Sequence, residues 1–307
     1  MSLLAFALAA AGVPADVVPA KCQRELVVLG AGQDAGAPQI GNARDAGPRL
    51  LPSSLALIDR TEGKRYLFDA TPAITEQLAM LDAIAPPKGG LGIDGIFLTH
   101  AHIGHYLGLA WLGREAAGAK GVPVYAMPRM AGFLRSNGPW SQLVELGNIS
   151  IKAMEPDLPI ILAEGSMVAG LRVPHRDEYS ETVGFAVTHP YSGKFLYIPD
   201  IDSWEEWEML ADDPFPGVIE RLDYVFLDAT FWDDNELPGR DMSEIPHPRV
   251  TETMDMLQDL PPAQRAKVHF IHYNHTNPIR DPASAESRTV TERGFKVARG
   301  GDRLCLD

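Results

Sequence analysis

The chain has little cysteine. Its 307 residues include only Cys22 and Cys305, which lie near opposite ends. So few cysteines exclude a disulfide-rich scaffold and a cysteine-rich zinc module. We expect two free thiols, and a disulfide that joins the two ends is the alternative.

The sequence also lacks long apolar runs and an excess of positive charge. No uninterrupted apolar stretch approaches the roughly twenty residues of a transmembrane helix. The formal net charge of -14 argues against a general nucleic-acid-binding surface, because phosphate neutralisation needs basic residues. We therefore expect a small-molecule substrate, no nucleic-acid partner and no integral membrane segment, and the composition indicates no oligomeric state.

The first twenty residues are apolar and rich in small side chains. The stretch from Leu3 to Gly12, followed by Ala15 and Ala20, is typical of the apolar core and cleavage region of a secretory signal. The positively charged start of such a signal is missing. We predict an export leader over residues 1–20, and a periplasmic or exported protein. The alternative is an amino-terminal helix of a cytoplasmic protein.

Residues 21–307 have the composition of one globular domain, with 45% hydrophobic and 22% charged residues over the whole chain. Apolar periodicity predicts strands at 25–29, 54–59, 65–69, 92–98, 122–126, 182–188, 194–198, 223–227 and 267–271. It predicts helices at 72–85, 106–112, 128–136, 250–260 and 283–293. This alternation predicts a layered α/β domain with helices on the outer faces of its sheets.

Three histidines occur within seven residues, at His100, His102 and His105. The predicted strand 92–98 ends just before them, and side chains alternate faces on an extended segment, so His100 and His102 project the same way. Gly104 permits a bend, and His105 opens the predicted helix 106–112. The alternative, a set of surface loop histidines, leaves this spacing unexplained. The H-x-H-x-x-H pattern therefore predicts a metal site.

Three further ligand-type residues follow predicted strands: His175, Asp200 and His272. Taken singly, each has an alternative as a loop histidine or as a turn-forming or capping aspartate. Zinc and iron both accept imidazole and carboxylate, and one carboxylate can bridge two ions. Together with the cluster, these residues predict a mononuclear or dinuclear centre.

The order of these residues resembles the metallo-β-lactamase fold superfamily. Within that superfamily, the chain is most similar to pyrroloquinoline quinone biosynthesis protein B-like proteins, in residues 28–30, 34–39, 231–236 and 274–279. The resemblance implies an αββα sandwich of two mixed β-sheets, with helices on the outer faces and a metal site at one edge.

The resemblance also assigns roles by position. It implies that a first metal is held by His100, His102 and His175, and a second by His105 and His272. The carboxylate that bridges the two metals would be Asp200. Asp200 would also act in catalysis. Asp69 would support the site, and Asp228 would either contact the ligands or cap a strand end.

The chain departs from its relatives in two places. The superfamily commonly has aspartate at the position of Gly104, so the second metal site loses a carboxylate. His275 or Asp202 could compensate, or could be surface groups. We therefore expect Zn²⁺ as the cofactor, nearer one ion than two, with Fe²⁺ as the alternative. Relatives that make the quinone tend to lack some cluster histidines and to carry a cysteine-rich zinc segment, but residues 40–50 contain no cysteine.

The function predicted from these residues is that of a metal-dependent hydrolase. Metal-activated water would attack an ester, lactone, amide or phosphoester, with Asp200 orienting it. Tyr179, Phe231 and Trp232 are candidates for the substrate pocket. Two alternatives remain: an iron-dependent oxidoreductase resembling the quinone biosynthesis protein, and a metal- or ligand-binding protein without turnover.

Overall fold

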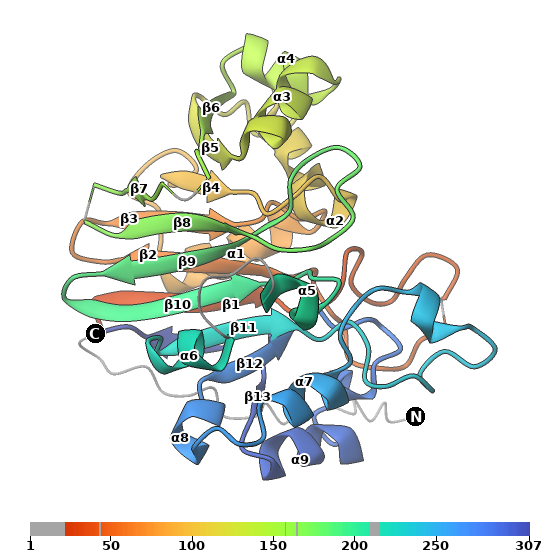
Figure 1. Cartoon of the computed structure of the whole chain (residues 1–307). Helices are drawn as coiled ribbons and strands as arrows, with labels where there is room; N and C mark the ends of the chain where they lie inside the picture. The colour runs from red at the N-terminus through yellow and green to blue at the C-terminus, as the bar shows by residue number, and fades with distance from the viewer. Residues whose placement is uncertain (1–21, 43, 157, 164, 209–214) are drawn as a thin grey trace, which may run out of the picture.

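The computed structural model describes residues 22–42, 44–156, 158–163, 165–208 and 215–307. Two seven-stranded sheets form its centre (Figure 1). The first contains, in spatial order, β14 (Arg303–Cys305), β1 (Arg24–Gly30), β2 (Ser54–Asp59), β3 (Lys64–Phe68), β4 (Gly95–Phe97), β5 (Val122–Ala126) and β6 (Ile149–Ala153). The second contains β13 (Lys296–Val297), β12 (Val268–Ile271), β11 (Tyr224–Asp228), β10 (Ser192–Ile198), β9 (Val183–His189), β8 (Met167–Arg172) and β7 (Ile160–Ile161). The predicted export leader lies outside the described residues.

Both sheets mix parallel and antiparallel pairs. In the first, β1, β2 and β3 pair antiparallel, whereas β3 to β6 pair parallel. In the second, β7 to β10 pair antiparallel and β10 to β13 pair parallel. Parallel neighbours bring their carboxyl ends to one edge of a sheet, which is where polar side chains that follow the strands can meet.

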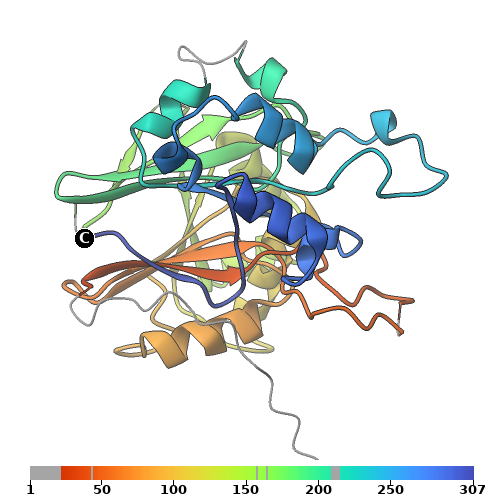
Figure 2. The same cartoon turned by 90° about the horizontal axis from the view of Figure 1, so that it is seen from below.

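Helices lie outside both sheets. Those following strands of the first sheet are α1 (Ile74–Ile84), α2 (Ile103–Tyr106), the 3₁₀ helix η1 (Leu107–Leu112), α3 (Pro128–Ser136) and α4 (Trp140–Glu145). The second sheet is followed by α5 (Trp204–Glu208), α6 (Phe215–Glu220), η2 (Met242–Glu244), α7 (Val250–Met256), α8 (Pro262–Arg265), η3 (Pro278–Arg280) and α9 (Ala285–Glu292). Figure 2 shows α1 (orange) outside the first sheet, and α6 and α7 (cyan to blue) outside the second. The predicted αββα sandwich is confirmed.

The apolar side chains form two clusters, because residues along a strand alternate between faces. On β1, Leu26 faces the cluster between the sheets and Val27 faces the cluster beneath α1, where Leu81 is buried. Phe68 and Phe185, from opposite sheets, have ring centroids 5.7 Å apart. Each fully buried side chain of this size contributes about 1.5–3 kcal/mol, so the clusters hold the strand ends in place.

The segment after β4 differs from the predicted continuous helix over 106–112. A short α2 is followed by the 3₁₀ helix η1. The carbonyl of His105 accepts a hydrogen bond from Ala70 N at 2.8 Å, and Gly108 N donates to Ala70 O at 2.8 Å. These bonds to a neighbouring segment replace the next turn of α-helix.

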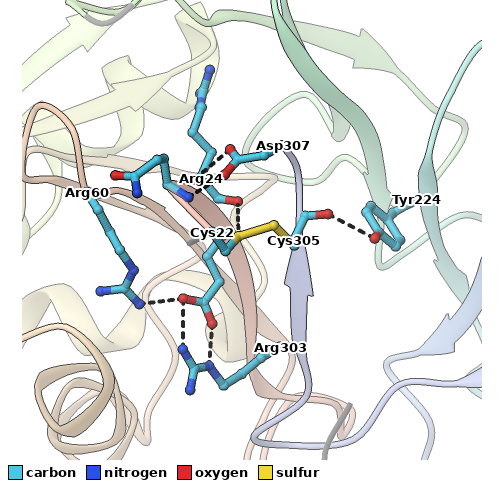
Figure 3. The surroundings of a disulfide bond; sticks show 9 residues. Cys22, Arg24, Arg60, Tyr224, Arg303, Cys305 and Asp307 are labelled. Atoms are coloured by element: carbon cyan, nitrogen blue, oxygen red, sulfur yellow. Dashed lines mark hydrogen bonds and ion pairs between the residues drawn. A yellow bond between two sulfur atoms is a disulfide. The ribbon is translucent and has the colours of Figure 1, made fainter. Parts of the chain in front are cut away.

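The prediction of two free thiols is wrong. Cys22 and Cys305 form a disulfide, with their Cα atoms 5.9 Å apart (Figure 3). The cause is the pairing of β14 with β1, in which Cys305 lies opposite Glu25. Two ends that are 283 residues apart in sequence therefore meet. The helices in the described ranges include none that is long and apolar enough to cross a membrane.

Candidate metal centre

The histidine segment runs along the edge of the first sheet where β4 ends. His100 and His105 are each 1% exposed, while His102 retains partial exposure at the start of α2. The ring of His100 lies 4.4 Å from that of His102 and 4.3 Å from that of His105, centroid to centroid. The fold thus gathers these side chains at one point.

Asp200 lies at the centre of the predicted site. It follows β10, and its Oδ2 is 2.9 Å from His105 Nε2, 3.2 Å from His272 Nε2 and 3.8 Å from His100 Nε2. Its Oδ1 is 3.7 Å from His175 Nε2. One carboxylate therefore faces four imidazoles that come from both sheets.

Asp69 orients two of the rings. The Nδ1–H of His105 donates to Asp69 Oδ2 at 2.8 Å. Thr99 Oγ1 donates to Asp69 Oδ1 at 2.9 Å, which leaves this hydroxyl to accept from His100 Nδ1 at 3.0 Å. These contacts direct the Nε2 atoms of both rings toward Asp200, and in the neutral form, which has one N–H, each Nε2 offers a lone pair there.

Asp228 and Asp202 orient the two histidine rings that follow strands of the second sheet. Thr230 Oγ1 donates to Asp228 Oδ1 at 2.7 Å and accepts from His272 Nδ1 at 3.2 Å. The Nδ1–H of His175 donates to Asp202 Oδ1 at 2.7 Å. Asp69, Asp202 and Asp228 therefore all contact the histidine set or the hydroxyls that orient it.

The ring of His102 directs Nδ1 toward the other histidines and Nε2 away from them. Its Nε2 lies 3.2 Å from Glu178 Oε2, and its Nδ1 lies 3.1 Å from His175 Nε2. The ligand atoms of His100, His102 and His175 all lie within 4.8 Å of one another. This set can hold one ion by two Nε2 atoms and one Nδ1 atom.

Four polar atoms at the centre are buried without a hydrogen-bond partner: the Nε2 atoms of His100, His105 and His272, and Oδ2 of Asp200. The close approach of Asp200 to His105 lacks the geometry of a hydrogen bond. A buried polar atom without a partner costs about 1–3 kcal/mol. Divalent cations bound there would satisfy all four atoms, so the residues present fit a metal.

The electrostatics of the rings differ from one another. Burial opposes protonation of His105, but Asp69 and Asp200 outweigh it and hold the pKa of this ring well above its usual value, so a metal would have to displace a proton from it. Burial holds the pKa of His100 well below its usual value, and burial also lowers the pKa of His272. Both rings are therefore neutral near pH 7, which is the form that binds metal. Burial opposes ionisation of Asp200, but His272 and His105 outweigh it and hold the pKa of that carboxyl well below its usual range.

Backbone strain is concentrated here. Among the described residues other than glycine, those with positive φ are Asp34 at 33°, Asp69 at 67° and His272 at 63°. Positive φ is uncommon for residues other than glycine, although aspartate and histidine adopt it more readily than most, and it persists where surrounding contacts hold it. All three belong to the centre or its immediate support.

Sequence reasoning missed two residues that the structure brings to the centre. The ligand atoms of Asp34 lie within 4.8 Å of those of His105 and His272. His247 Nδ1 donates to Asp228 Oδ2 at 2.7 Å, and lies 3.9 Å from Asp200 Oδ1. Asp34 stands in a stretch that carried the resemblance, so its position there was the available signal. His247 follows no strand, and no spacing marks it.

Some predicted residues lie elsewhere. The ring of His275 contacts Asn274 through Nδ1 at 2.7 Å, and His275 belongs to none of the ligand groups formed by the described residues. Its chain turns away because Asn274 Oδ1 also accepts from the His275 backbone N–H. Tyr179 is 63% exposed and packs against Phe133 on α3.

The two aromatic residues after β11 lie nearer the centre. The Phe231 ring is 4% exposed and lies 6.1 Å from the His247 ring. Trp232 is partly buried against the cluster between the sheets. Phe231 therefore packs beside His247, and Trp232 follows it in the same loop.

Comparison with known proteins identifies the family. The family model described as "Beta-lactamase superfamily domain" matches residues 64–273, which span β3 to the residue after His272. The chain belongs to the metallo-β-lactamase superfamily. It is similar over nearly its whole length to "Coenzyme PQQ synthesis protein B" of Methylococcus capsulatus, at 28% identity over 91% of this chain and 99% of the relative. The protein of the same name from Bradyrhizobium diazoefficiens is 25% identical over 92% and 99%.

Two solved structures share the fold. Zn²⁺-bound PqqB from Methylobacterium extorquens has a TM-score of 0.74 and 21% identity, and covers 91% of this chain and 99% of its own. A diphosphatase of the PhnP family has a TM-score of 0.63 and 24% identity, with 92% and 96% covered. The prediction of a metallo-β-lactamase fold with similarity to the PQQ protein B family is confirmed.

Proposed function

We propose that this chain is a metal-dependent hydrolase that acts on an ester, lactone, amide or phosphoester of small size. The observation that carries the proposal is the set of four buried polar atoms without partners around Asp200. Zn²⁺ would be held by His100, His102 and His175, with Asp200 bridging to a second ion at His105 and His272. When bound, zinc lowers the pKa of a water molecule to about 7 and polarises a substrate oxygen.

Asp200 and His247 have separate roles in proton transfer. The low pKa of Asp200 keeps it ionised, so it accepts a hydrogen bond from the attacking water and orients it. Burial opposes protonation of His247, but Asp228 outweighs it and raises the pKa of this ring. This shift favours the protonated ring of His247, which supplies the proton that the leaving group requires.

Phe231 and Trp232 stay candidates for contact with the substrate near His247. The Phe231 ring lies next to the proposed proton donor, and the Arg249 guanidinium lies over the Phe231 ring, 5.5 Å from its centroid.

Metal content and turnover test the proposal. Purified protein should contain zinc by elemental analysis and should hydrolyse at least one of p-nitrophenyl acetate, a lactone or bis-p-nitrophenyl phosphate. Chelation should abolish turnover and added zinc should restore it. The His102→Ala variant should lose the metal of the first site and the activity. His189→Ala, whose ring contacts Tyr191 at the end of β9, is the matched control and should retain both. Unchanged metal content in His102→Ala would contradict the ligand set.

The similarity to the PQQ protein B family supports a second candidate, an iron-dependent oxidoreductase that uses the same ligands. Tightly bound iron and oxygen-dependent turnover would favour it over the hydrolase. Metal binding and ligand binding without turnover of any kind would instead indicate a binding protein.

We also propose that the protein is exported and acts in an oxidising compartment, with residues 1–20 as its leader. The Cys22–Cys305 disulfide supports this, because disulfides persist in such compartments and are rare in a reducing cytosol. Mass spectrometry of the protein purified from its native source should show removal of the leader. An intact Met1 would contradict export by cleavage.

A further inference from the structure

Gly104 stands where the resemblance to the superfamily implies a ligand carboxylate, and the space beside it is filled. A Cβ on residue 104 would lie 2.4 Å from Asp34 Cα and 2.4 Å from Asp34 Oδ1. Real Cβ atoms do not approach so closely. An aspartate at position 104 and the observed Asp34 therefore exclude each other.

The carboxylate of Asp34 faces the second half of the centre. Its Oδ1 lies 3.6 Å from His105 Nε2, and its ligand atoms and those of His105 and His272 lie within 4.8 Å of one another. The Nε2 atoms of both histidines are buried and have no hydrogen-bond partner. An acidic side chain aimed at two such nitrogens forms the donor set that zinc accepts.

The loop that carries Asp34 is tied to the strand end that carries His272. Gln33 N donates to Tyr273 O at 3.0 Å, and Tyr273 N donates to Ala31 O at 3.1 Å. Within the loop, Gly36 N donates to Gln33 O at 2.7 Å and closes a turn around Asp34. These bonds hold Asp34 at its positive φ and set its distance from His272.

We propose that Asp34 is the carboxylate ligand of the second metal ion, supplied from the β1–β2 loop in place of the side chain that Gly104 lacks. The proposal rests on the proposed metal centre and extends it. The second ion would be held by Asp34, His105 and His272, with Asp200 shared between the two ions. The protein should therefore retain two zinc ions per chain, and not nearer one as the sequence alone predicts.

Metal stoichiometry tests the proposal. Zinc per chain should be measured by elemental analysis after dialysis against metal-free buffer, for the full chain and for Asp34→Asn. Asparagine tolerates a positive φ and has nearly the same volume, so the fold should persist. We expect two ions in the unmodified protein and one in Asp34→Asn. Asp241→Asn, an exposed aspartate that contacts Ser243, is the matched control and should retain two.

A second variant tests the steric relation. Gly104→Ala places a Cβ against the Asp34 backbone and should lose the same ion, whereas Gly132→Ala, with nothing within 4 Å, should not. Two ions in Asp34→Asn would overturn the proposal. A single ion in both the unmodified protein and Asp34→Asn would overturn it while leaving the first site intact. Absence of zinc from the unmodified protein would contradict the proposed function as well as this proposal.

Discussion

At the residue scale, the centre depends on which nitrogen of each histidine is protonated. Asp69 accepts the Nδ1–H of His105, and Asp202 accepts that of His175, so both rings direct Nε2 inward. Removing such an acceptor commonly lowers metal affinity about 10–100-fold. The sequence contains these aspartates at strand ends, but only the distances show which ring each one orients.

His247→Asn is expected to slow hydrolysis without removing the metal. His247 contacts Asp228 and approaches Asp200, but its ring belongs to neither proposed histidine set. Loss of a general acid lowers kcat about 10²–10⁴-fold. Zinc content should be measured beside kcat, and a substrate with a better leaving group should recover part of the rate. A proportional loss of zinc would show a structural role instead.

His269 is expected to make the protein sensitive to acid. Burial, with a smaller effect of Lys296, lowers the pKa of His269 to about 3, and its Nε2 has no partner. The pKa of histidine in the unfolded chain is about 6.5. Below that pH, His269 is protonated in the unfolded chain but stays neutral in the folded chain. The free energy of unfolding therefore falls as the pH drops from about 6.5 to about 3, by up to about 1.4 kcal/mol per pH unit from this group.

The variant His269→Phe should weaken this dependence. The His269 ring packs 5.1 Å from Phe226 and 6.0 Å from Tyr224, so an aromatic replacement keeps the packing. Urea unfolding at pH 7 and pH 5 should show a smaller difference for the variant than for the unmodified protein. Equal differences would mean that His269 does not titrate as its burial indicates.

At the element scale, the histidine segment is held by its contact with the segment after β3. The backbone of Ala70 bonds to both His105 and Gly108, and Thr99 N donates to Asp69. This contact places His105 against its partner Asp69. It also explains why a predicted continuous helix becomes a short α2 followed by η1.

Gly108→Ala should disturb this contact. A Cβ at residue 108 would lie 2.2 Å from Thr71 O and 2.8 Å from Ala70 O. Overpacking against backbone costs about 1–3 kcal/mol. Thermal unfolding should show a lower Tm, and zinc affinity should fall because His105 moves from Asp69. Gly132→Ala within α3 meets nothing within 4 Å and should leave stability equal or higher by about 1 kcal/mol. Equal Tm for both variants would contradict the role of Gly108.

Elements with clear apolar patterns were predictable, while those formed by distant pairing were not. The strands observed as β1, β2, β5 and β12 agree with prediction within about two residues. The short β13 and β14 were not predicted, because each is formed by pairing with β12 or β1 and carries no pattern of its own. Local periodicity indicates which face of a strand is buried. It does not indicate which strand a short edge strand pairs with.

At the scale of the whole molecule, the first and last residues that the structure describes lie together at the edge of the first sheet. Cys305 on β14 bonds to Cys22 ahead of β1, and the Tyr224 hydroxyl of the second sheet donates to Cys305 O at 3.0 Å (Figure 3). Arg24 N also donates to the Asp307 carboxylate at 3.0 Å. The last residues therefore fasten the edge of one sheet and contact the other.

Cys305→Ala is expected to lower the free energy of unfolding by about 2–4 kcal/mol, because the disulfide closes a very long loop in the unfolded chain. Chemical denaturation of the oxidised protein and of the variant measures the difference. A thiol reductant should lower the stability of the unmodified protein toward that of Cys305→Ala, and should leave the variant unchanged. Equal stability before and after reduction would contradict this contribution.

The sequence by itself determined the layered α/β class and the close spacing of three histidines, because apolar periodicity and ligand spacing are local properties of the chain, and the resemblance of its motifs indicated the superfamily. Only the tertiary structure decided which carboxylate orients each ring, that Cys22 meets Cys305, and that Asp34 occupies the space beside Gly104. These relations join residues that lie far apart in sequence. The distances between these residues depend on strand pairing and backbone contacts, which the local sequence pattern does not indicate.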